Sequence, residues 1–212
     1  MDRRALLHPA PDTALTRGLP AQAGFTLIEL ITVMAIMVLI SGLILSNNSL
    51  FSGKVELQNL AYDIGLSIRQ AQVYGISVER FATGVFAGAY GVHFDTSNRN
   101  TYVLFADVLP PINGVYDCPT PGSNCELVLD NTIRSGYTIA QLCATPAGGS
   151  ESCVSAPTSG SLDITFQRPE PDAFIRASWL PGINETGRII LQSARGDTRS
   201  VVVEVNGQIA VQ

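Results

Sequence analysis

The chain is 212 residues long, is 46% hydrophobic and carries a formal net charge of −5 at pH 7. An acidic balance disfavours non-specific attraction to phosphate backbones, which argues against a general nucleic-acid binder. The length allows one compact domain beside a membrane anchor and is hardly enough for two.

The first long apolar segment runs from Gly24 to Leu45 and reads GFTLIELITVMAIMVLISGLIL. As a helix, Phe25 to Leu45 spans about 31 Å, the thickness of the hydrocarbon part of a bilayer. A cleaved secretory signal has a shorter apolar stretch followed by small residues, whereas here the small residue, Gly24, comes first. The segment is therefore predicted to cross a membrane and to contact its lipid.

A polar leader, residues 1–24, precedes the apolar segment and carries three arginines and two aspartates. Lys and Arg next to a membrane span favour the cytoplasmic side. We therefore expect a single-pass protein of the inner (plasma) membrane. Its N-terminus should be cytoplasmic and its C-terminal domain periplasmic or extracellular.

Glu29 interrupts the apolar segment with a carboxylate. Such a group costs about 2.5 to 3.5 kcal/mol at the centre of a lipid-facing helix and less near an end. Glu29 either extends to the membrane surface or has a cationic partner. Cleavage between Gly24 and Phe25 would provide that partner, because it exposes the α-amine of Phe25 on a neighbouring subunit.

The residues from Gly24 to Glu29, GFTLIE, resemble the class III signal of type IV prepilins and of type II secretion pseudopilins. The resemblance implies that a prepilin peptidase cuts after Gly24 and methylates the new N-terminus at Phe25. It also implies that Glu29 guides docking between subunits. The expected partners are this peptidase, other pilin or pseudopilin subunits and an inner-membrane assembly platform.

Three segments follow from this interpretation: a cleaved leader (1–24), a transmembrane and filament-core helix (25–46) and an extracytoplasmic globular domain (47–212). The domain is expected to begin with a helix over 47–79. Its apolar residues recur at steps of three and four, which indicates one face packed on the domain. These apolar residues are Leu57, Leu60, Ala61, Ile64, Ile68 and Ala71.

Residues 81–212 show short apolar runs separated by turn residues, which predicts strands. The predicted strands are 84–94, 101–106, 133–139, 162–167, 174–177, 188–193, 200–205 and 208–211. Asn206 and Gly207 predict a type I′ hairpin turn. Segments 110–131 and 144–161 are predicted to be loop-rich inserts. The expected fold class is α+β and pilin-like, with a long N-terminal helix packed on an antiparallel sheet.

Four cysteines, Cys118, Cys125, Cys143 and Cys153, lie in the half of the chain that is expected outside the cytoplasm, where disulfides persist. Four cysteines allow three pairings. We favour Cys118 with Cys125 and Cys143 with Cys153, since each pair closes a local loop. Their spacing does not match the close pairs of structural zinc sites, so no metal is expected there.

The sequence contains no arrangement of residues typical of catalysis, and no cofactor is expected. Of the two histidines, His8 belongs to the leader and His93 lies in a predicted strand. General acid-base catalysis by His93 would need a positioned partner. Asp95 and the Asn and Ser residues that follow it are typical of a turn rather than a calcium loop, which needs a bidentate Glu.

Within the family, the chain most resembles the GspH/FimT group of minor pseudopilins and minor pilins. Its helix LAYDIGLSIRQAQVYGISVE and its C-terminal region GRIILQSARGDTRSVVVEVNGQIAV carry this resemblance. Some members bind DNA through C-terminal arginines, which implies a weak candidate site at Arg188, Arg195 and Arg199. These arginines alternate with acidic residues, and nucleic acid is an unfavoured partner.

The sequence thus predicts a prepilin-like structural subunit, a minor pseudopilin or minor pilin of a type II secretion pseudopilus or a type IV pilus. It is expected to be a peptidase substrate and not an enzyme. Two alternatives stay open: a DNA-binding minor pilin for DNA uptake, and a membrane-anchored extracytoplasmic domain that never polymerises.

Overall fold

A computed structural model of the chain describes residues 24–77, 80–81, 85–118 and 126–212. The chain divides into two compact units, Met1–Ser46 and Asn47–Gln212. Each unit is described by itself. The leader before Gly24 lies outside the described residues.

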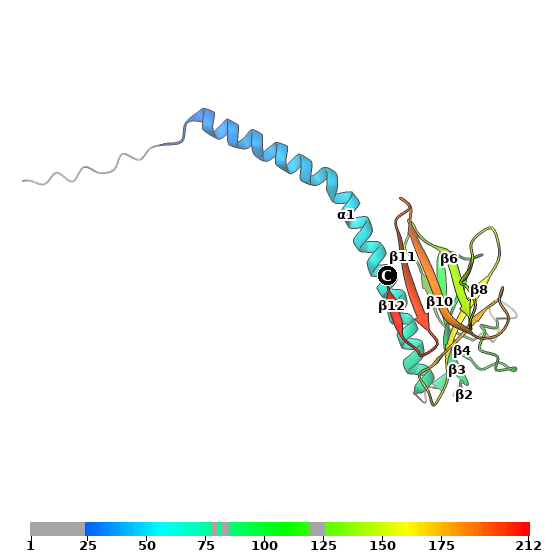
Figure 1. Ribbon diagram of the computed structural model, residues 1–212. Helices are drawn as coiled ribbons and strands as arrows, with labels where there is room; N and C mark the ends of the chain where they lie inside the picture. The colour runs from blue at the N-terminus through cyan, green and yellow to red at the C-terminus, as the bar shows by residue number, and fades with distance from the viewer. Residues whose placement is uncertain (1–23, 78–79, 82–84, 119–125) are drawn as a thin grey trace, which may run out of the picture. The chain divides into compact units, whose positions relative to one another are not determined.

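The helix α1 (Leu27–Ile76) runs through both units without interruption (Figure 1). The sequence predicted helix over the same region, with its end at residue 79. The structure instead ends the helix at Ile76 and places Ser77 in a turn, where its N–H donates to the carbonyl of Val73 at 2.9 Å.

The described part of the second unit is rich in strands, and every pairing is antiparallel. The strands are β1 (Arg80–Phe81), β2 (Val85–Phe86), β3 (Ala89–Asp95), β4 (Thr101–Asp107), β5 (Leu127–Thr132), β6 (Tyr137–Pro146), β7 (Ser152–Val154), β8 (Ser161–Phe166), β9 (Ala173–Ala177), β10 (Asn184–Ser193), β11 (Thr198–Glu204) and β12 (Ile209–Val211). β1 and β2 form a separate small sheet. The main sheet has the order β12-β11-β10-β9-β8-β3-β4-β5, and β6 joins it through β10 and carries β7.

The second half of α1 packs on one face of the main sheet (Figure 1). Of the apolar residues predicted to face the domain, Leu57, Ala61, Ile64, Ile68 and Ala71 are fully buried, and Leu60 is half-buried. Their partners are alternate residues of the strands, such as Val92, Phe94, Leu162, Ile164, Phe166, Val201 and Val203. The burial of one helix face against one sheet face confirms the predicted α+β architecture.

The prediction of a strand at 133–139 is wrong for its first half. Residues 133–136 form the turn between β5 and β6, in which Gly136 has a φ of +95° and the Tyr137 N–H donates to the Arg134 carbonyl at 3.2 Å. A strand residue has negative φ, so the chain reverses here instead of extending.

The two segments predicted to be loop-rich inserts also contain strands. All of β5 except its last residue lies inside 110–131, and the end of β6 and all of β7 lie inside 144–161. β5 is an edge strand whose apolar residues Leu127, Val128 and Leu129 are all exposed, so it lacks the alternation that reveals a half-buried strand. β7 has three residues and pairs with β6 only, beside the disulfide.

The hairpin at Asn206 and Gly207 is present, but its turn is not type I′. Gly207 has a φ of +80°, whereas no non-glycine residue in the described chain has positive φ. The Gly207 N–H donates to the Glu204 carbonyl, and the Glu204 N–H donates to the Gln208 carbonyl, both at 2.9 Å. This is a three-residue loop that ends in a left-handed glycine, the next most common hairpin connection.

The structure joins Cys143 to Cys153 by a disulfide between paired residues of β6 and β7, with an S–S distance of 2.04 Å. This is one of the two bridges favoured from the sequence. Cys118 is also disulfide-bonded. Its expected partner, Cys125, lies outside the described residues.

Replacing both Cys143 and Cys153 with alanine is expected to lower the free energy of unfolding by about 2 kcal/mol, because the bridge closes a short loop and constrains the unfolded chain. The measurement is urea unfolding of the full chain in detergent, followed by the fluorescence of Trp179, the single tryptophan. An unchanged midpoint under oxidising conditions would contradict this expectation.

Candidate functional site

The N-terminal end of α1 is held by Thr26, the residue just before the helix. The Thr26 hydroxyl accepts the N–H of Glu29 at 3.3 Å, and its carbonyl accepts the N–H of Leu30 at 3.2 Å. A Thr followed three residues later by Glu is the capping-box spacing, and it satisfies an N–H group that the helix leaves unpaired. This role of Thr26 was not predicted from the sequence, although the Thr-x-x-Glu spacing carries the signal.

Glu29 therefore lies in the first turn of α1, where the positive end of the helix dipole favours a negative charge. Its side chain is exposed. Within the described residues, no Lys or Arg lies at ion-pair distance from its carboxylate. The structure thus presents a carboxylate one turn from Phe25, in a segment, Leu27–Leu45, that has no other charged residue.

The segment Leu27–Leu45 is long and apolar enough to cross a membrane, with a mean hydropathy of 2.6. None of this segment is buried within the protein itself. Large aliphatic side chains such as Leu27 and Ile36 are 76% and 55% exposed. An apolar surface of this extent needs lipid or other protein chains to cover it.

The three arginines that formed the weak DNA-binding candidate do not share one surface. Arg188 of β10 is ion-paired with Glu151 at 3.2 Å. Arg199 of β11 pairs with Leu191, a fully buried core residue, so Arg199 lies on the core face of the sheet. Arg188 lies next to the core residue Ile189 in the same strand and therefore points to the opposite face. Arg195 lies in the exposed turn between β10 and β11.

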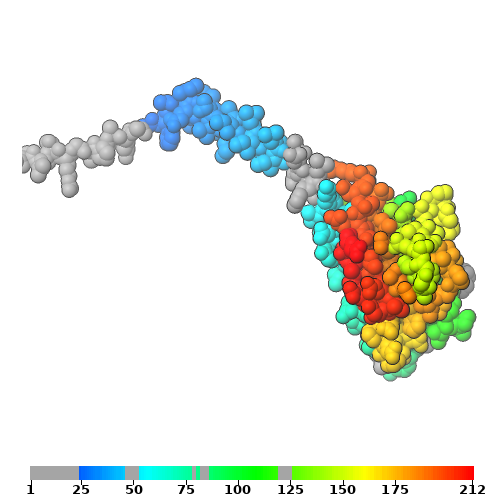
Figure 2. Space-filling model, in the orientation of Figure 1, coloured from blue at the N-terminus to red at the C-terminus, as the bar shows by residue number. Residues whose placement is uncertain are grey.

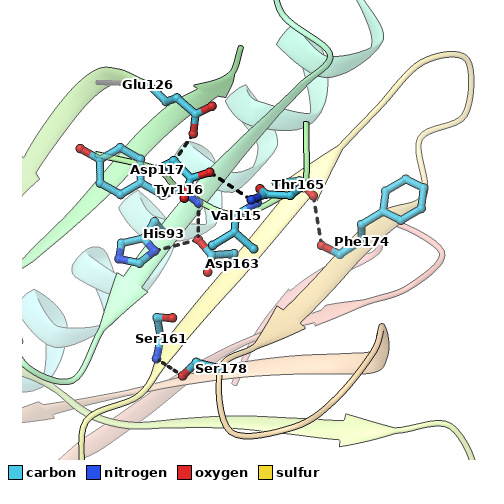
Figure 3. Close-up of polar contacts among 11 residues, drawn as sticks. His93, Val115, Tyr116, Asp117, Glu126, Ser161, Asp163, Thr165, Phe174 and Ser178 are labelled. Carbon is cyan, nitrogen blue, oxygen red and sulfur yellow. Dashed lines mark hydrogen bonds and ion pairs between the residues drawn. The ribbon is translucent and has the colours of Figure 1, made fainter. Parts of the chain in front are cut away.

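His93 has a partner, Asp163, that was not predicted from the sequence. Its Nδ1 lies 2.7 Å from Oδ1 of Asp163, the residue opposite it on β8 (Figure 3). The backbone N–H of Tyr116 donates to the same oxygen at 3.2 Å. Asp163 thus holds both the His93 ring and the backbone of Tyr116, so the pair fastens the loop after β4 to the sheet.

The loop after β4 is held by the buried carboxylate of Glu126 (Figure 3). One oxygen accepts the N–H groups of Val108 and Leu109, and the other accepts the N–H of Asp117, all at 2.9 Å. Three backbone donors satisfy a carboxylate that would otherwise be costly to bury. Within this loop, the ring of Tyr116 lies 5.1 Å from the His93 ring and 5.6 Å from the Phe105 ring, between ring centroids, so the loop packs against β3 and β4.

Asp107, at the end of β4, is fully buried beside Glu126 and accepts the N–H of Gly114 at 2.7 Å. Burial raises the pKa of the Asp107 carboxyl from 3.8 to about 6, and the nearby charges of Glu126 and Asp117 act in the same direction. The folded chain therefore holds a proton at this site that the unfolded chain releases.

The contribution of Asp107 to the free energy of unfolding is expected to decrease as the pH rises from 3.8 to about 6, because in this range folded Asp107 keeps a proton that the unfolded chain has released. Asp107→Asn removes this dependence and is expected to stabilise the protein near pH 8 by about 1 kcal/mol, since a neutral amide accepts from Gly114 without burying a charge. Urea unfolding at acidic and alkaline pH, followed by Trp179 fluorescence, measures both effects. If the free energy of unfolding changed with pH in the same way for wild type and Asp107→Asn, the raised pKa of Asp107 would be contradicted.

Comparison with known proteins agrees with the geometry at the start of α1. Residues 19–45 match the family model described as a prokaryotic N-terminal methylation motif. The match covers Gly24, Phe25 and Glu29 and ends at the last residue of the apolar segment. No curated protein and no solved structure matches the chain.

Proposed function

We propose that this chain is a minor pseudopilin or minor pilin. The proposal rests on its N-terminal methylation motif at residues 19–45, which is the class III signal of type IV pilin-like prepilins. The chain is assembled into a type II secretion pseudopilus or a type IV pilus and serves protein secretion or pilus biogenesis. The motif implies processing by prepilin peptidase and assembly with other pilin subunits.

The observation that carries the proposal is the exposed apolar helix Leu27–Leu45 with its carboxylate at Glu29. A plain anchor has no use for a charge at this position, since the charge opposes insertion. Cleavage after Gly24 places the α-amine of Phe25 one helical turn from a carboxylate. Between two subunits, the amine of one and Glu29 of the other neutralise each other, which sets the stagger of packed helices.

The membrane holds the subunit before assembly. In the proposed orientation the leader is cytoplasmic and the domain from residue 47 is periplasmic or extracellular. An inner-membrane assembly platform then extracts the helix from lipid, and the aliphatic side chains of Leu27–Leu45 pack against other subunits. The protein acts through assembly and not as an enzyme.

The test is the recovery of the chain in sheared filaments from cells with and without a prepilin peptidase. We expect recovery only with the peptidase, and we expect Gly24→Lys to abolish it while the protein stays in the membrane. A chain that remains in the membrane fraction in all strains would contradict the proposal and favour an anchored domain that does not polymerise.

A further inference from the structure

The domain half of α1 has a second row of exposed side chains besides its buried face. This row consists of Val55, Tyr62, Leu66, Arg69, Val73 and Ile76. Successive members are seven, four, three, four and three positions apart in the sequence. The five uncharged members are 40% to 66% exposed. A repeat of four and three places side chains along one seam of a helix, and such a seam packs against another helix.

A groove lies next to this row, between α1 and β12. It is lined by Tyr62, Gly65, Leu66, Arg69, Ile209 and Val211. The groove is open at Gly65, where an added Cβ would meet nothing closer than Val211 at 3.7 Å. The C-terminal strands lie against the second half of the helix in Figure 2, which shows this side of the domain.

Arg69 is the single charge of the row. It donates to the side-chain oxygen of Gln72, a neutral group. Among residues 24–77, 80–81, 85–118 and 126–212, no carboxylate is within ion-pair distance of Arg69. An apolar seam with one cation is complementary to an apolar helix with one carboxylate, and Leu27–Leu45 with Glu29 is such a helix.

We propose that this row and groove bind the N-terminal part of α1 from a second copy of the chain, an inference that rests on the proposed function. The two helices run parallel, and Glu29 of the second copy lies opposite Arg69. Placing Glu29 opposite Arg69 shifts one helix by forty residues (69 − 29) along the other. The same shift brings three further pairs together: Phe25 with Gly65, Val33 with Val73 and Ile36 with Ile76. The aromatic ring of Phe25 fills the space above the glycine.

This contact leaves the proposed amine pair intact. A carboxylate has two oxygens, so Glu29 accepts from the Phe25 amine of one neighbour and from Arg69 of another. The Arg69 contact joins residues forty apart in the sequence (69 − 29), whereas the amine pair joins residues four apart (29 − 25), so the two contacts involve different subunits of one filament. Arg69 thereby gives the assembly a second fixed register.

Disulfide cross-linking tests the register. One version of the full chain carries Val33→Cys and a second carries Val73→Cys, both at exposed positions. The two are produced together in cells that have a prepilin peptidase, and their sheared filaments are oxidised. We expect a cross-linked dimer above the level that either version gives alone.

The matched control replaces Val73→Cys with Val55→Cys, which lies in the same row, is similarly exposed and is about 27 Å away along the helix. No dimer above background is expected from it. In the cross-linking pair, Arg69→Glu is expected to reduce the dimer about tenfold, whereas Arg69→Lys is expected to retain it.

The outcomes separate this inference from the proposed function. Equal cross-linking at Val55 and Val73, or none at Val73 in filaments that contain the processed chain, overturns the register while the proposed function stands. An unprocessed chain that never enters filaments overturns both.

Discussion

Replacing Glu29 with alanine is expected to lower recovery of the chain in sheared filaments at least about tenfold, while insertion into the membrane is unaffected. Removal of a carboxylate from an apolar segment makes insertion easier, and it deletes one member of each proposed charge pair. The measurement compares the amounts of wild type and variant in the membrane and filament fractions of the same cells.

Two controls make this result specific to the charge. Glu29→Gln keeps the size of the side chain and is expected to fail like alanine. Thr32→Ala removes a polar group one turn further along, whose hydroxyl only donates to the carbonyl of Glu29 at 2.9 Å, and is expected to assemble normally. Equal recovery of Glu29→Ala and wild type would refute the assembly role.

Replacing Gly75 with alanine is expected to destabilise the domain by about 3 kcal/mol, although alanine is the better helix former. A Cβ at this position would lie 2.4 Å from the carbonyl oxygen of Phe166 and 2.9 Å from its Cβ. The backbone of β8 cannot move away without disturbing its pairing with β3 and β9. Urea unfolding followed by Trp179 fluorescence measures the loss.

Gly65 is the matched control, because it lies on the same helix and has room for a Cβ, with Val211 at 3.7 Å. Gly65→Ala is expected to stabilise the monomer in detergent by about 0.5 to 1 kcal/mol, the usual gain in a helix interior. If both substitutions shifted the unfolding midpoint in the same direction, close packing at Gly75 would not be the cause.

The features that the sequence predicted correctly are local. The apolar segment Leu27–Leu45 is visible from hydropathy alone, and the buried face of the second half of α1 follows from residues three and four apart. The hairpin from β3 to β4 was also predicted, and its turn contains the Asp95 carboxylate accepting the Ser97 N–H at 2.7 Å.

The features that the sequence did not reveal depend on contacts between distant segments. His93 contacts Asp163 across neighbouring strands. Glu126 accepts hydrogen bonds from backbone N–H groups of the preceding loop, such as that of Val108. Nothing near His93 in the sequence identifies its partner, since register decides it. β5 was missed because edge strands exposed on both faces have no alternation to detect.

The turn at Asn206 and Gly207 shows how a local signal can be overridden. The dipeptide favours type I′, but Gly207 is packed so closely that an added Cβ would lie 2.3 Å from the Pro171 carbonyl and 2.5 Å from Nε2 of Gln72. Gln72 donates to the carbonyls of both Pro171 and Gly207. The helix and the loop before β9 thus determine where the glycine lies.

The intact mass of the protein from membranes shows whether the chain is a prepilin cut between Gly24 and Phe25. Cells with and without a prepilin peptidase are compared. We expect loss of residues 1–24 and gain of one methyl group only when the peptidase is present. A chain that keeps Gly24, or that is cut elsewhere, would contradict it.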